Sequence, residues 1–143
     1  MSTRRICAFH VGELLLGVDV ELVQEVLGDA LMTRVPLAGP SVSGVLNLRG
    51  QIVAAIDARQ RLGLPPRHPD DGRTNIVIRT EHESVSLVVD AEGEVVDLAD
   101  SDVEQLPENV SERIRSLVTG ACRVDDDLLL LLDAERTLTL GPD

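Results

Sequence analysis

The chain has 143 residues and a formal net charge of −12, from 25 acidic and 13 basic residues. Nucleic acids and anionic membrane surfaces are bound by basic faces, so this balance argues against both as partners. Hydrophobic residues make up 43% of the chain, yet Phe9 is its only Phe, Tyr or Trp. One domain of ordinary size is expected, with a core built from Leu, Val, Ile and Ala.

The sequence also bears on the compartment. No apolar run approaches the roughly 20 residues that a membrane-spanning helix needs. Residues 1–5 lead directly into strand-like sequence, without the apolar segment and cleavage site of a secretory signal. Cys7 and Cys122 are too few for a disulfide framework, and we expect buried, reduced thiols. These features predict a cytoplasmic protein with no segment inserted in a membrane.

Short β-branched or Leu-rich segments, separated by Gly, Asp or Pro turns, predict many strands. In chain order the expected strands are 5–11, 13–18, 31–35, 51–56, 74–79, 84–89, 94–98, 118–124 and 128–132. Helical signals are brief by comparison. The pattern therefore predicts a mainly β fold, closed as a barrel or a sandwich.

The longest helical signal is residues 20–27, where apolar side chains recur at helical spacing after Asp19, a candidate N-cap. Three further segments are about one turn long, and two of them directly follow an aspartate. These segments are 58–62 after Asp57, 111–116, and 134–138 after Asp133.

The two halves of the chain share a pattern. At one constant shift, Leu16, Val18 and Asp19 align with Leu87, Val89 and Asp90; after a short insertion, Gly44, Asp57 and Ala58 align with Gly120, Asp133 and Ala134. This repeat predicts two similar small barrels with a shared apolar core. The expected subdomains are 1–64 and 73–143, with a linker near 64–72, and which strands exchange between the barrels is left open.

Residues 44–57 combine an apolar approach, a tight Arg49-Gly50 turn and a buried strand that ends in Asp57. A turn between two core-facing segments holds Arg49 on the surface. The aligned turn of the second half carries Asp125-Asp126 instead, which favours a function on the first half. Because no nucleophile motif, phosphate loop or metal cluster accompanies the turn, it predicts the binding of a partner rather than catalysis.

Several motifs stand in a characteristic order. They are VQEV at 23–26, RVP at 34–36, GVLNLRG at 44–50, IV at 52–53 before Asp57, LVVD at 87–90 with EV at 94–95, and Gly120 before 128–133. In this order and spacing, from Ile6 to Leu138, the chain resembles the CheW family, the adaptors of bacterial chemotaxis. It departs from the family's usual sequence at 14–16, where an aromatic residue is usual, and at Ala54, where proline is frequent.

The resemblance implies one CheW-like domain over 1–143, made of two packed five-stranded SH3-like β-barrels with a few short helices. It implies a non-catalytic adaptor that couples the cytoplasmic tips of chemoreceptors to the regulatory domain of the histidine kinase CheA and so modulates the kinase. Recruitment to membrane-anchored receptor arrays follows from that role. Arg49 would lie at or near the receptor-facing surface, and no cofactor is implied.

The candidate receptor- or kinase-binding residues surround this turn. Glu25 would end the first short helix, where an acid is electrostatically disfavoured. It either forms a bidentate ion pair with Arg49 that orients the guanidinium, or is simply solvated. Val23, Val45 and Leu46 either line an aliphatic docking groove or belong to the core. The full candidate set is Arg49, Gly50, Glu25, Val23, Asn47, Gly44 and Val45.

Other readings are less well supported by the residues. A stand-alone SH3-like module would bind an extended peptide along a sheet edge and be indifferent to Arg49; an adaptor of a non-motility chemosensory pathway would look the same as a chemotaxis adaptor. No Gly-x-Ser-x-Gly motif offers a nucleophile. The three histidines lack metal-ligand spacing, and Asp125–Asp127 are consecutive acids rather than a spaced calcium loop. Neither an enzyme nor a metal protein is expected.

Overall fold

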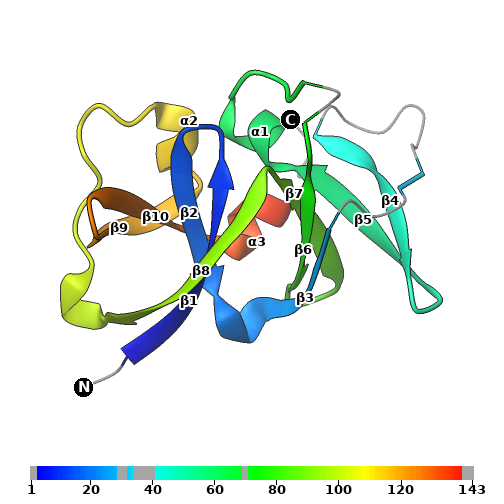
Figure 1. Ribbon diagram of the computed structural model, residues 1–143, viewed down its shortest axis with the longest axis horizontal. Coiled ribbons are helices and arrows are strands. Elements are labelled where there is room, and N and C mark those ends of the chain that lie inside the picture. Colours follow the sequence, from blue (N-terminus) through cyan, green and yellow to red (C-terminus); the bar gives the residue numbers. More distant parts are fainter. Residues whose placement is uncertain (1–2, 29–31, 34–40, 69–70, 140–143) are drawn as a thin grey trace.

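The computed structural model describes residues 3–28, 32–33, 41–68 and 71–139. Two β units lie side by side, with α3 between them and α1 and α2 above them (Figure 1). The strands are β1 (Thr3–Val11), β2 (Leu14–Asp19), β3 (Val23–Leu27), β4 (Val42–Leu48), β5 (Gln51–Asp57), β6 (Thr74–Arg79), β7 (Ser84–Val89), β8 (Ala91–Ala99), β9 (Val118–Val124) and β10 (Asp127–Leu132). The helices are η1 (Val20–Leu22), α1 (Ala58–Leu62), η2 (Asp100–Asp102), α2 (Glu112–Arg115) and α3 (Ala134–Leu138).

The described strands form two five-stranded sheets of equivalent topology, as the predicted fold class requires. We call the sheet of order β8-β1-β2-β10-β9 the first barrel and the sheet of order β3-β6-β7-β5-β4 the second barrel. Each contains an antiparallel hairpin, β1–β2 or β6–β7, whose second strand pairs in parallel with the penultimate strand of the order, β10 or β5. The sequence repeat is therefore a repeat of structure.

The closure of the two barrels follows the same repeat. Thr33 and Val45 exchange two backbone hydrogen bonds, at 2.9 and 2.8 Å, which join the segment after β3 to β4. Glu104 and Ala121 exchange the equivalent pair, at 2.6 and 3.0 Å, which joins the segment after β8 to β9. Each bridge connects the two ends of one strand order, so each sheet is curled onto itself.

The barrels do not follow the halves of the chain. The opening hairpin β1–β2 shares a sheet with β8, β9 and β10, whereas the hairpin β6–β7 shares a sheet with β3, β4 and β5. Each barrel thus contains strands from both 1–64 and 73–143, and the two hairpins are the elements that are exchanged.

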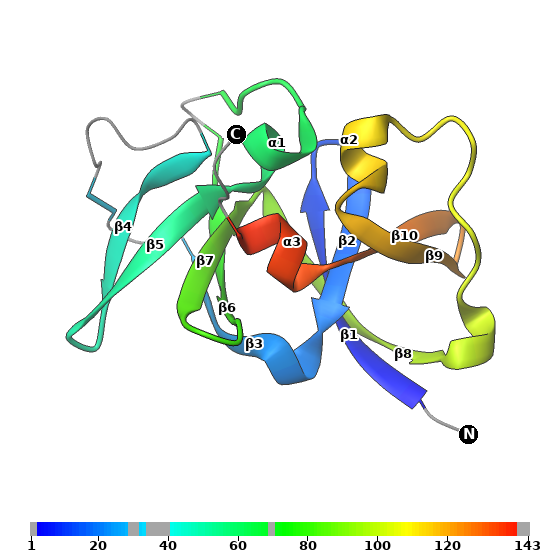
Figure 2. The ribbon, with the colours of Figure 1, turned by 180° about the vertical axis from the view of Figure 1, so that it is seen from behind.

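The main core lies between the barrels. Phe9, Leu16 and Val18 of the first barrel pack in one buried cluster with residues of the second, such as Ile76 and Leu87. Smaller clusters fill the first barrel around Cys122 and Leu129 and the second around Leu46 and Val88. Strands β6 and β7 are buried on both faces because one face lines a barrel and the other meets its neighbour. In both views α3 is seated between the two sheets (Figures 1 and 2).

Most helix starts and strand bounds agree with the signals in the local sequence. Asp57 and Asp133 cap α1 and α3 by accepting hydrogen bonds from the amides of Arg59 and Arg136, and Ser111 caps α2 through the amide of Ile114. The strands at 74–79, 84–89 and 118–124 have the predicted bounds. Strand β4 was expected only as an apolar approach, and β8 is longer than expected.

The predicted helix at 20–27 is wrong. Only Val20–Leu22 forms a 3₁₀ turn, and Val23–Leu27 is strand β3, paired with β6. In this segment β-branched residues and an available partner strand outweigh a helical spacing of apolar residues. The expected strand at 31–35 is described only at 32–33, where Thr33 forms its bridge; the RVP motif at 34–36 lies outside the described residues.

Two further expectations concern membranes and thiols. No helix in the described part of the chain is long and apolar enough to cross a bilayer. Cys122 is buried and Cys7 half-buried, both with free thiols. Burial raises the pKa of each thiol above its ordinary value, which keeps both protonated at neutral pH.

Candidate functional site

The Arg49-Gly50 turn is the tip of the β4–β5 hairpin, which projects at the end of the second barrel away from the first (Figures 1 and 2). Leu48 pairs with Gln51 across the turn. Arg49 and Gly50 both have positive φ, 53° and 84°, as a two-residue hairpin turn of matching twist requires. The Asn47 side chain accepts a 2.9 Å hydrogen bond from the Gly50 amide, so the candidate Asn47 fixes the turn from within.

Glu25 and Arg49 form the predicted ion pair. Arg49 Nη2 donates to Glu25 Oε1 at 3.1 Å, and the side chains are 77% and 24% exposed for Arg49 and Glu25. Two parts of the prediction are wrong: the described contact is one hydrogen bond rather than a bidentate pair, and Glu25 lies in strand β3 rather than at a helix end. Because β3 and β4 are the two ends of the strand order, the pair spans the closure of the second barrel.

The other candidates divide between closure and core. Gly44 is buried, and a Cβ there would collide with the carbonyl oxygen of Thr33. Val45 makes the backbone bridge to Thr33, and Val23 is half-buried against the main core. Leu46 is buried inside the second barrel, so it belongs to the core and does not line a docking groove.

An exposed apolar residue beside the turn was not singled out from the sequence. Ile52 is 65% exposed and pairs in register with Asn47, next to the guanidinium-bearing turn. Its position in the strand run 51–56 suggested burial, since that run is almost entirely apolar. The hairpin tip therefore presents a cation held by one acid and, beside it, an aliphatic side chain.

The turn equivalent to Arg49-Gly50 carries an acid instead of a cation. Asp125, with φ 54°, turns the β9–β10 hairpin at the place equivalent to Arg49. Within 3–28, 32–33, 41–68 and 71–139, no three His, Cys, Asp or Glu side chains are grouped as metal ligands.

Comparison with known proteins gives a consistent result. The family model described as "CheW-like domain" matches residues 5–140. The chemotaxis protein CheW of Rhizobium meliloti is 30% identical over 132 residues, which are 92% of this chain and 85% of that protein. CheW of Bacillus subtilis is 33% identical over 106 residues, 74% of this chain and 68% of that protein.

The structural comparison agrees. The crystal structure of the scaffolding protein TtCheW from Thermoanaerobacter tengcongensis superposes with a TM-score of 0.82 at 28% identity, covering 92% of this chain and 90% of that one. The sequence repeat, the paired barrels and these matches have one reading: the chain belongs to the CheW family of chemotaxis proteins.

Proposed function

We propose that this chain is a non-catalytic adaptor that couples the cytoplasmic tips of chemoreceptors to the regulatory domain of the histidine kinase CheA, and so modulates kinase activity. Family membership and the scaffolding role named for TtCheW support this proposal. The protein would be recruited from the cytoplasm to membrane-anchored receptor arrays. Its receptor-facing surface is the hairpin tip, with Arg49 as the central residue.

The backbone of Arg49 carries the proposal. A non-glycine residue in the left-handed region costs roughly 1–2 kcal/mol. Arginine lacks the short polar side chain with which Asn and Asp offset this cost by bonding to the nearby backbone. Aspartate, which tolerates this conformation better, occupies the equivalent turn at Asp125. The turn thus retains a strained arginine at its exposed tip, and strain of this kind is characteristic of binding sites.

The surroundings of Arg49 orient its charge. Glu25 accepts from one guanidinium nitrogen and leaves the side chain mostly exposed, so further donors face outward. An exposed pair of this kind adds at most about 1 kcal/mol to stability, and its main effect is orientation. Ile52 beside it supplies apolar area that a partner can cover.

The first test is binding of the labelled chain to a receptor tip and to the kinase regulatory domain from the same genome. Arg49→Gly removes the guanidinium while leaving a residue that favours positive φ, so the hairpin stays intact. We expect this variant to lose receptor binding and retain kinase binding. Arg5→Gln is the control, because it also removes the charge of an exposed, ion-paired arginine, here on the other barrel.

The outcomes separate the readings. Loss of receptor binding in Arg49→Gly but not in Arg5→Gln supports the proposed receptor face. Equal binding by wild type and Arg49→Gly places the receptor face elsewhere. Failure of the wild type to bind either partner, with saturable binding to extended peptides, would replace the adaptor by a peptide-binding module.

A further inference from the structure

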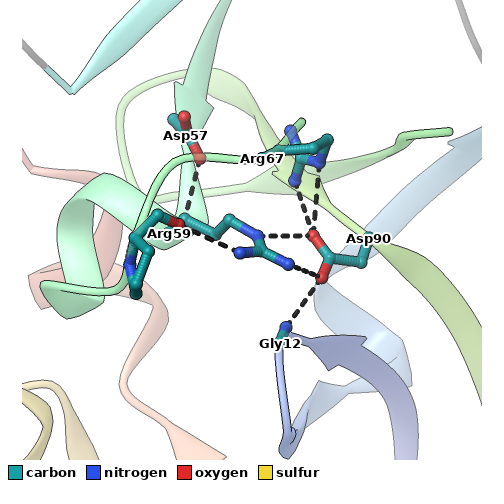
Figure 3. A network of polar contacts seen from close by, with 6 residues as sticks. Gly12, Asp57, Arg59, Arg67 and Asp90 are labelled. Carbon is teal, nitrogen blue, oxygen red and sulfur yellow. Dashed lines mark hydrogen bonds and ion pairs between the residues drawn. The ribbon is translucent and has the colours of Figure 1, made fainter. Parts of the chain in front are cut away.

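Asp90 lies at the point where the chain passes from the second barrel to the first, between β7 and β8. Its carboxylate accepts five hydrogen bonds (Figure 3). Arg59 donates through Nε to Oδ1 at 3.0 Å and through Nη2 to Oδ2 at 2.6 Å. Arg67 donates through Nε and Nη2 to Oδ1 at 3.2 and 2.9 Å, and the Gly12 amide donates to Oδ2 at 2.7 Å.

These donors come from both barrels. Gly12 is in the β1–β2 turn of the first barrel, whereas Arg59 is on α1, which follows β5 of the second. Arg67 belongs to the segment expected as a linker, and Arg59 also donates to the Pro65 carbonyl at 3.0 Å, which holds that segment in place. One carboxylate therefore ties together the two barrels and the segment that connects β5 to β6.

The cluster is largely shielded from water, since the side chains of Asp90, Arg59 and Arg67 are 23%, 17% and 8% exposed. Burial by itself would favour the neutral acid, but the hydrogen bonds from Arg59, Gly12 and Arg67 outweigh it and hold the pKa of Asp90 well below its usual range. The carboxylate is thus ionised throughout the physiological range, and the contacts are charge-assisted.

A second set of arginine contacts crosses the same junction. Arg113 of α2 donates to the carbonyls of Arg61 and Gln60, at 3.0 and 2.7 Å, at the end of α1. Arg61 in turn donates to the carbonyls of Thr137 and Arg136, at 2.8 and 2.7 Å, at the end of α3. Since α2 and α3 flank β9 and β10, these cations satisfy helix-end carbonyls across the boundary between the barrels.

The core between the barrels gives a reason for this arrangement. That core is aliphatic apart from Phe9, and apolar burial is non-directional. Aliphatic faces alone define the angle between two barrels poorly. Fork-shaped guanidinium–carboxylate contacts are directional and supply the missing geometry.

We propose that the Asp90 cluster is a clasp that holds the two barrels at one fixed angle, with Asp90, Arg59 and Arg67 as positioning residues for simultaneous binding of two partners. The second part rests on the proposed function; the first does not. The cluster and the Arg49 turn are at opposite ends of β5, so the clasp is separate from the candidate receptor face.

The angle is measured first, without any partner. Spin labels are attached through a ketone-bearing amino acid at positions 51 and 94, which are exposed and lie on different barrels, so the native cysteines stay unchanged. We expect one narrow distance distribution for the wild type and a broader one for Asp90→Asn and for Arg67→Gln. Asp97→Asn is the matched control, because Asp97 forms an exposed Arg5 pair outside the clasp. A broad wild-type distribution, or narrow ones in both clasp variants, would overturn the clasp.

Binding is measured second. We expect Asp90→Asn and Arg67→Gln to bind the receptor tip and the kinase domain singly as the wild type does, but to form the three-component complex about tenfold less well, since avidity depends on geometry. If the variants assemble the ternary complex as well as the wild type despite a broadened distance distribution, the positioning role is wrong and the clasp is still supported. If the wild type binds neither single partner, the proposed function is wrong. The distance distributions still test the clasp in that case.

Discussion

Two arginines of this chain show how context decides what a charged side chain does. Arg49 is exposed, makes one hydrogen bond and sits on a strained backbone, so its contribution to stability is small and its charge is directed outward. The Arg67 side chain is nearly buried and donates from both Nε and Nη2 to a single acid. Arg49 is suited to recognition and Arg67 to holding the fold.

Asp90 predicts an acid-dependent stability. Its pKa is depressed in the folded protein, so the stabilisation is fully present above the ordinary carboxyl pKa of 3.8 and is lost as pH falls from there towards the folded value. We expect Asp90→Asn to lower the free energy of unfolding by about 2 kcal/mol at pH 7. The difference in free energy of unfolding between wild type and variant should narrow below pH 4. Urea denaturation of both proteins at pH 7, 4 and 3 checks this. A stability difference that widens on acidification would contradict it.

The closing bridges explain two glycines that the repeat aligned. Gly44 on β4 lies against the segment that follows β3, and Gly120 on β9 lies against the segment that follows β8. A Cβ at Gly44 would collide with the backbone oxygen of Thr33, whereas one at Gly120 would lie 2.8 Å from a methyl group of Val103 and 3.3 Å from the Glu104 oxygen. At the same place in both barrels, a Cβ would therefore come into close contact with the segment that closes the barrel.

Alanine at these glycines should cost unequal amounts. We expect Gly44→Ala to destabilise the protein by about 3 kcal/mol and Gly120→Ala by about 1 kcal/mol, because a side-chain methyl moves aside more easily than backbone. Gly72→Ala is the control, since no atom lies within 4 Å of its Cβ position and its φ is not positive. Urea denaturation measures all three, and a Gly44→Ala variant as stable as Gly72→Ala would refute the close-approach argument.

The exchanged hairpins make the two barrels one cooperative unit. Each barrel takes a hairpin from the opposite half of the chain, and the largest buried cluster contains residues of both barrels. Neither half of the sequence contains all the strands of a barrel. The duplication therefore yields a single folding unit rather than two independent ones.

Fragments provide the corresponding test. We expect peptides 1–64 and 73–143 to be unfolded separately and to fold when mixed, because only the mixture supplies five strands to each barrel. Far-ultraviolet circular dichroism and thermal melting of each fragment and of the equimolar mixture measure this. Cooperative melting of 1–64 alone would show that its strands can close without the exchange.

The sequence by itself determined the features that depend on neighbours along the chain. The strands at 74–79 and 84–89, the aspartate caps of α1 and α3, and the turn that exposes Arg49 follow from residue type and spacing within a few positions. The repeat was also readable, by aligning the halves. The Glu25–Arg49 pair was predicted from the placing of an acid at a helix end, and the pair is present although Glu25 lies in strand β3.

Only the tertiary structure decided what depends on distant partners. Residues 23–27 became a strand because β6 lay beside them, although their spacing also suited a helix. The exchange of hairpins pairs strands from opposite halves of the chain. The gathering of Gly12, Arg59 and Arg67 around Asp90 joins positions up to 78 residues apart. Local patterns record which side chains are apolar or charged, but the choice among distant partners is made by the packing of the whole chain, through long-range pairing and a shared core.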